Sequence, residues 1–152
     1  MPVASDAIAG LLAARRKGTL ATLRRDGRPQ LSVVTYAWYP DEDGRQLVRI
    51  STVERRAKVA NLRRDPRASF LVPDDSGWSY AVVEGHVELS GVATFHDDEV
   101  VEELIRVYRD AHRGAHSEPG EHPDWAEYRR AMVDDHRLVA RLVFEHAYGL
   151  TR

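Results

Sequence analysis

The sequence contains no cysteine, carries almost balanced charge and has no long apolar run. The missing cysteine excludes disulfides, thiolate nucleophiles and cysteine-ligated zinc, and it fits a reducing compartment. With 22 basic and 24 acidic residues the formal net charge is −2, so no overall field attracts nucleic acid or an anionic membrane. Apolar stretches such as residues 31–38 are too short to cross a bilayer, and residues 1–16 lack a signal-peptide core. We therefore expect a cytoplasmic protein without nucleic-acid or membrane partners.

The composition is that of an ordinary folded domain. Hydrophobic residues make up 43% of the 152 residues and charged residues 30%. A chain of this length buries about 70% of its unfolded surface in one core. No internal repeat, low-complexity tract or long linker divides it, so we predict one domain over residues 1–152.

The first third of the chain predicts a helix followed by strands. Residues 5–17 have apolar positions at helical spacing and begin with Ser5 as a cap. Residues 19–23 and 30–38 are rich in β-branched and aromatic side chains and flank an Asp-Gly turn, which predicts a hairpin. A third strand is expected over residues 46–52.

The remaining elements alternate less regularly. We expect a basic helix over residues 54–65, a helix over 97–112 and another that begins at Pro123. Three more strands are expected at 68–72, at 78–89 with a bulge or a close backbone approach at Gly85, and at 138–144. This order fits a mainly β fold, an antiparallel barrel with peripheral helices, better than any βαβ fold.

The run Ser51–Lys58 has the composition of an anion site. Two hydroxyl residues end a strand, and the helix that follows begins with basic side chains. Arg56 can form a fork to a phosphate, and Lys58 adds a compact charge, so the run suits a phosphorylated cofactor tail. The alternative is a solvated basic helix face that pairs with Glu54 and Asp65. The run by itself leaves both interpretations open.

Several further motifs occur in an order that is informative as a whole, although each is weak alone. They are Asp26–Ser32, Ser51–Thr52 with Arg56 and Lys58, Asn61–Ser69, Gly77–Val82, Glu121–Trp125 and Tyr128–Arg129. Together they cover most of the chain, which resembles the split-barrel flavin and deazaflavin oxidoreductases, the pyridoxamine 5'-phosphate oxidase-like group. The resemblance implies a split β-barrel of six to seven antiparallel strands with flanking helices.

The resemblance also implies a homodimer with two cofactors at the subunit interface. The phosphate would lie against Ser51, Thr52, Arg56 and Lys58, and the ring system along the strands that include Gln30, Ser32, Val48 and Ile50. Trp78 matches a position that closes the pocket. No protein nucleophile is implied, because the cofactor carries the reaction.

Two cofactors fit this resemblance. Oxidases that make pyridoxal phosphate use FMN and end in an Arg-Leu-x-Pro type motif, which the run His146–Arg152 lacks. The His-Pro-Asp-Trp region looks like the deazaflavin-dependent branch. We therefore expect coenzyme F420 and hydride transfer to or from a small conjugated organic molecule, with FMN as the alternative. A carrier or sensor that binds the cofactor without turnover is a third interpretation.

The sequence does not identify a proton donor: Tyr80, a histidine or bulk water could serve. His112 and His116 stand four residues apart with His122 nearby, a spacing found in some metal sites. Gly114 and the loop composition around it disrupt the helical face that such ligation needs, so we expect no metal site. The aromatic residues Tyr36, Trp38 and Tyr80 are expected to pack in the sheet.

Overall fold

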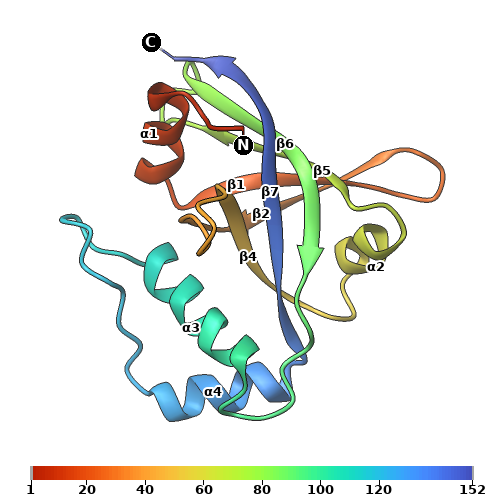
Figure 1. The fold of residues 1–152 in the computed structure, drawn as a ribbon, viewed down its shortest axis with the longest axis vertical. Helices are drawn as coiled ribbons and strands as arrows, with labels where there is room; N and C mark the ends of the chain where they lie inside the picture. Colours follow the sequence, from red (N-terminus) through yellow and green to blue (C-terminus); the bar gives the residue numbers. More distant parts are fainter. Residues whose placement is uncertain (1, 152) are drawn as a thin grey trace.

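Seven antiparallel strands form one curled sheet in the computed structural model, which describes residues 2–151 (Figure 1). The predicted domain also includes Met1 and Arg152, which lie outside the described residues. The spatial order of the strands is β2-β1-β5-β6-β7-β4-β3. They are β1 (Lys17–Leu23), β2 (Pro29–Thr35), β3 (Ala37–Trp38), β4 (Leu47–Val53), β5 (Arg67–Pro73), β6 (Tyr80–Leu89) and β7 (Arg137–Leu150). This architecture confirms the predicted split barrel.

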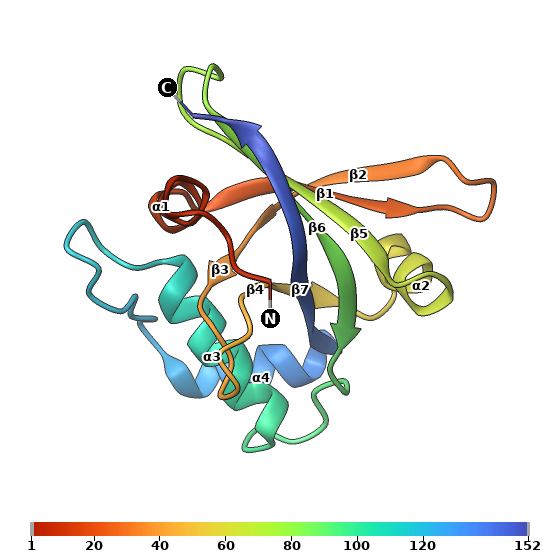
Figure 2. The same cartoon turned by 45° about the horizontal axis from the view of Figure 1, so that its top comes forward.

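Four helices flank the sheet. They are α1 (Asp6–Ala14), α2 (Ala57–Arg64), α3 (Glu99–Ala111) and α4 (Trp125–Asp134). α3 and α4 lie together on one side, whereas α2 lies beside the protruding β1–β2 hairpin (Figures 1 and 2). The side chains of Ser5, Asp98 and Asp124 cap α1, α3 and α4 by accepting a backbone N–H of the first turn. No helix within residues 2–151 is both long and apolar enough to cross a membrane.

The core has two parts, one on each face of β7. Ala140, Leu142 and Phe144 point into the barrel interior, where Tyr36 and Phe70 also pack. Val139 points the other way, toward the apolar faces of α3 and α4. Because side chains alternate along a strand, β7 connects both parts.

Gly85 lies at a bulge in the β6–β7 ladder, as predicted. Glu84 pairs with His146 and Gly85 pairs with Phe144, so Glu145 is the extra residue of the bulge. A Cβ atom at position 85 would lie 1.8 Å from the carbonyl oxygen of Val143, which explains why this position needs glycine. The Asp-Gly turn also forms as predicted, with Gly27 at φ 85°.

Several boundaries differ from the sequence-based prediction, and three of the differences have a clear structural reason. Residues 30–38 form two strands, because Tyr36 leaves the ladder and its hydroxyl donates 2.6 Å to the carbonyl of Leu12. The basic helix begins at Ala57 rather than at residue 54, because the Arg56 N–H closes a turn onto Val53. β7 continues to Leu150, well beyond residue 144, because it stays paired with β6 after the bulge.

Candidate functional site

A cavity of about 720 Å³ lies where the sheet is split. Within the described chain β2 pairs only with β1, and β3 covers β4 only at Val48 and Arg49. β2 and the last residues of β4 therefore approach each other without pairing, and both line the cavity. Strand edges of this kind offer unpaired backbone N–H and C=O groups. The slot between β2 and the last residues of β4 can thus form hydrogen bonds to the edge of a planar heteroaromatic ring.

Most of the predicted cofactor residues surround this cavity: Gln30 and Ser32 from β2, Ser51 and Thr52 from β4, and Arg56 and Lys58 at the start of α2. Three do not. Val48 and Ile50 are fully buried in the barrel core, so their side chains contribute packing, and only their backbone could approach a ligand. Trp78 lies in the β5–β6 loop, 68% exposed, and does not line this cavity.

The cationic end of the cavity carries charge that the protein does not neutralise. Within residues 2–151 neither the exposed Arg56 guanidinium nor the half-buried Lys58 ammonium makes a hydrogen bond or ion pair, so the pairing with Glu54 and Asp65 does not form. Those two carboxylates bind Arg63 and Arg67 instead. Burial lowers the pKa of Lys58, and the charges of Arg56 and Arg137 lower it further. An anion would relieve this repulsion.

A hydrogen-bond network orients Gln30, which lines the cavity. The side-chain amide of Asn61, which is buried, donates 2.7 Å to Gln30 Oε1 and 3.1 Å to Thr22 Oγ1. Arg64 in turn donates to Asn61 Oδ1. Because the Gln30 oxygen is occupied, its amide nitrogen is the group left to donate to a ligand.

The helices form an apolar and aromatic wall that sequence reasoning missed. Val107, Tyr108, Ala111 and His112 come from the end of α3, and Tyr128 and Met132 come from α4. Burial raises the pKa of Tyr128 to about 12, and its neutral hydroxyl donates to the Leu104 carbonyl. The signal in the sequence was the spacing of four between Tyr108 and His112, which places both on one helix face.

His112 is the one histidine that lines the cavity within the described chain. Its ring stacks on Tyr108 with centroids 4.1 Å apart, and Nδ1 lies 3.0 Å from the Tyr108 carbonyl oxygen. A carbonyl can only accept, so Nδ1 carries the proton and Nε2 is the nitrogen left for other partners. Tyr80, His86 and His146, by contrast, do not line the cavity.

Within residues 2–151 no group of three or more histidine, aspartate or glutamate side chains is placed to hold a metal ion.

Nearly the whole chain matches a known protein family. The family model described as pyridoxamine 5'-phosphate oxidase matches residues 4–149. The chain belongs to this family. Members of the pyridoxamine 5'-phosphate oxidase family are oxidoreductases built on a flavin-binding split barrel.

Several solved structures are similar to the chain in fold. The conserved hypothetical protein Rv2991 of Mycobacterium tuberculosis is 29% identical, with a TM-score of 0.68, over 97% of this chain and 84% of that one. A protein named F420 reductase is 24% identical, with a TM-score of 0.62, over 96% and 98% of the two chains. A pyridoxamine 5'-phosphate oxidase-related FMN-binding protein of Nostoc punctiforme is 17% identical, with a TM-score of 0.63, over 99% and 86%.

Proposed function

We propose that this protein is an F420-dependent oxidoreductase that transfers a hydride between the deazaflavin and a small conjugated organic molecule. The observation that carries the proposal is the pair of uncompensated cations, Arg56 and Lys58, beside two strand-end hydroxyls in the cavity. Family membership supplies the reaction class. The similarity to the protein named F420 reductase, over nearly the full length of both chains, supports the choice of cofactor.

The residues present fit such a cofactor. Arg56 and Lys58 would hold its phosphate together with Ser51 and Thr52, because charge-assisted hydrogen bonds to phosphate are strong. The ring would lie in the slot between β2 and β4, where Gln30 presents its amide nitrogen and the strand edges present backbone groups. When bound, the deazaflavin supplies hydride transfer.

The protein itself positions the acceptor against the cofactor ring and excludes water from the cavity. The wall of Val107, Tyr108 and Met132 covers one side of the cavity with apolar surface. An acceptor held there against a flat ring is aligned for hydride transfer. Such alignment lowers the activation barrier of the transfer substantially. A planar conjugated acceptor suits a cavity with this aromatic wall.

Side-by-side titration with F420 and FMN tests the cofactor. We expect F420 to bind at least about tenfold more tightly, a difference of about 1.4 kcal/mol. Tighter binding of FMN would move the protein to the FMN-dependent alternative, which the similarity to the FMN-binding protein of Nostoc punctiforme favours.

A second experiment separates an enzyme from a carrier or sensor. The protein is mixed with reduced F420 and a panel of conjugated acceptors: a quinone, a tetrapyrrole and an unsaturated lactone. Oxidation of the cofactor that depends on both protein and acceptor supports the enzyme. Tight binding without turnover across the panel would support the carrier.

The absence of cysteine supports a cytoplasmic location, which localisation of a tagged protein can check.

We further propose that the protein acts as a homodimer. Val33, Leu71 and Tyr148 lie in one row across β2, β5 and β7, on the face of the sheet away from the barrel core, and all are exposed. Leu31 and Leu150 extend this apolar row. Val33 also lines the cavity, so a second copy seated on the row would adjoin the cofactor.

The dimer gives Trp78 a role that one copy does not provide. The loop that carries Trp78 leads into Tyr80, which pairs with Leu150. Trp78 therefore lies near the end of the apolar row that is farthest from β2. A second copy could therefore bring its own Trp78 to this cavity and close it. Light scattering should give a dimer mass at micromolar concentration, with more than about 2,000 Å² buried. A monomer that still binds cofactor would contradict the proposal.

A further inference from the structure

Arg137 occupies an unusual position at the cationic end of the cavity. α4 ends at Asp134, and His136 then takes the left-handed conformation with φ 56°, which is uncommon for a residue with a side chain. The backbone N–H of Glu54 donates 3.0 Å to the His136 carbonyl and fixes the turn. Arg137 begins β7 opposite Val53 and lines the cavity.

The Arg137 side chain is 31% exposed, and its guanidinium has few partners in the protein. Nε is buried and has no hydrogen-bond partner within residues 2–151. Nη1 lies 3.4 Å from Ser51 Oγ, a long contact, and the ion pair from Nε to Asp135 spans 3.9 Å. Most buried polar groups in proteins are paired, so an unpaired one at a cavity is available to a ligand.

Arg137 also stands close to the other two cations. Its charge, like that of Arg56, contributes to the lowered pKa of Lys58. Three positive charges around one cavity repel one another, and the contact with Ser51 places Arg137 next to the predicted phosphate residues. An anion with one charge would compensate less of this repulsion than a phosphorylated group with two or more charges.

We propose that Arg137 is a third cationic ligand of the cofactor tail, and that the cavity thereby selects a phosphorylated tail carrying at least two negative charges. The planar fork of the guanidinium matches two phosphate oxygens, which the Lys58 ammonium cannot do. The proposal rests on the proposed function in assigning the anion to a flavin or deazaflavin. Nothing in the sequence marked Arg137, because its closeness to Ser51 depends on strand pairing.

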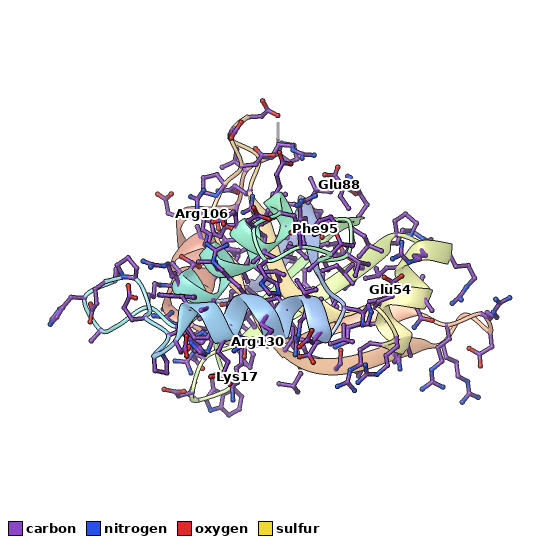
Figure 3. All side chains as sticks on the ribbon, turned by 90° about the horizontal axis from the view of Figure 1, so that it is seen from below. Lys17, Glu54, Glu88, Phe95, Arg106 and Arg130 are labelled. Atoms are coloured by element: carbon purple, nitrogen blue, oxygen red, sulfur yellow. The ribbon has the colours of Figure 1, made fainter. Side chains whose placement is uncertain are left out.

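Titration of two variants and a control tests this role. Arg137→Met removes the charge and keeps the stem, Arg137→Lys keeps the charge without the fork, and Arg130→Met changes an exposed arginine of α4 (Figure 3). The ligands are F420, FMN and their phosphate-free counterparts. For whichever phosphorylated cofactor the wild-type protein binds, we expect Arg137→Met to weaken binding about tenfold or more and Arg137→Lys by less.

Binding of the phosphate-free counterparts should change less than about twofold in both variants, and Arg130→Met should match the wild type. Equal weakening for phosphorylated and phosphate-free ligands would show a structural role and overturn the proposal. Unchanged affinity for the phosphorylated cofactor would overturn it as well.

A wild-type protein that binds neither cofactor would defeat the proposed function, and Arg137 is then tested with inorganic pyrophosphate alone. Pyrophosphate should raise the thermal midpoint of the wild-type protein and of Arg130→Met, but not that of Arg137→Met. An equal rise in all three, or no rise in the wild type, would overturn the role of Arg137.

Discussion

Two groups of basic side chains include arginines of the paired strands β4 and β7, and within residues 2–151 carboxylates neutralise only one of the groups. In the closed cluster Arg49 and Arg141 are paired across the strands, and both bind Glu103 of α3. In the open cluster Arg56, Lys58 and Arg137 surround the cavity and have no carboxylate within hydrogen-bond distance in the described chain.

The closed cluster is completed by further contacts. Arg49 donates 2.6 Å to the carbonyl of Tyr39 and lies over that ring, 3.8 Å from its centroid. Burial lowers the pKa of Arg49, whereas the hydrogen bonds to Glu103 raise the pKa of Arg141. Every charge here has its partner inside the protein, so this cluster joins α3 to the sheet. The comparison teaches that charge compensation, and not charge alone, distinguishes a structural arginine from one that serves a ligand.

The largest effect should follow from removing the carboxylate of the closed cluster. Glu103→Ala leaves Arg49, 5% exposed, beside Arg141 without a counter-charge, so we expect a loss of about 3 kcal/mol in the free energy of unfolding. Urea denaturation measures it. Cofactor affinity should change less than about threefold in the protein that remains folded. A loss below about 1 kcal/mol would mean that the two clusters differ less than their contacts suggest.

In the open cluster, substitutions should lower cofactor affinity strongly and the free energy of unfolding only slightly. Arg56→Ala and Lys58→Ala should each weaken cofactor binding by about 10-fold to 100-fold, since charge-assisted contacts are worth about 1.5–3 kcal/mol. Their effect on the free energy of unfolding should stay below about 1 kcal/mol, because neither side chain has a partner in the protein. Titration and denaturation of the same samples compare the two. Unchanged cofactor affinity in both variants would contradict the proposed anion site.

The pH dependence of binding sharpens the comparison further. Burial and the neighbouring Arg56 and Arg137 lower the pKa of Lys58 in the free protein, and a bound anion would raise it again. Binding then takes up a proton between those two pKa values, so affinity is highest below the free pKa and falls as the pH rises through it. The fall should begin below the usual lysine value of about 10.4 and approach tenfold per pH unit.

Lys58→Ala should abolish this slope. The affinity is measured from pH 7 upward in the wild type and the variant, with circular dichroism to confirm that each remains folded. The same slope in both proteins would assign the proton to another group.

The smallest effect is expected from residues outside both clusters. Tyr80→Phe, His86→Gln and His146→Gln should slow single-turnover oxidation of the reduced cofactor by less than about threefold, because none lines the cavity. His112→Gln is the informative comparison, since His112 does line it. A positioned general acid typically contributes at least about 10²-fold. A loss of that size in any variant with intact binding would identify the proton donor and contradict protonation by solvent.

Local signals in the sequence predicted most of the fold. Ser5 caps α1, the Asp-Gly turn joins β1 to β2, and Gly85 marks the bulge, because each depends on a few neighbouring residues. The end of β7 was missed for a physical reason. Apolar side chains face the barrel at every second residue up to Phe144, but after the extra residue Glu145 the phase shifts, so that Ala147 faces the core instead. A pattern of period two cannot continue through a bulge.

The site was predicted where its residues are close in sequence. Ser51, Thr52, Arg56 and Lys58 lie within eight positions of one another and do line one cavity. Arg137 and the wall of α3 and α4 join them only through strand pairing and helix packing across about fifty residues or more, which no local pattern encodes. Alternation along β4 could have warned that Ile50 points away from Ser51.

The position of β7 in the sheet also sets the time at which the protein can fold during synthesis. β4 pairs only with β3 and β7 within the described chain, so the β4–β3 part of the sheet joins the other strands through β7. Until residues 137–150 have left the ribosome, two separate pieces of sheet expose apolar faces. A nascent chain of this protein therefore depends on β7 to close the core, and variants that slow the pairing of β7 should aggregate before they lose activity.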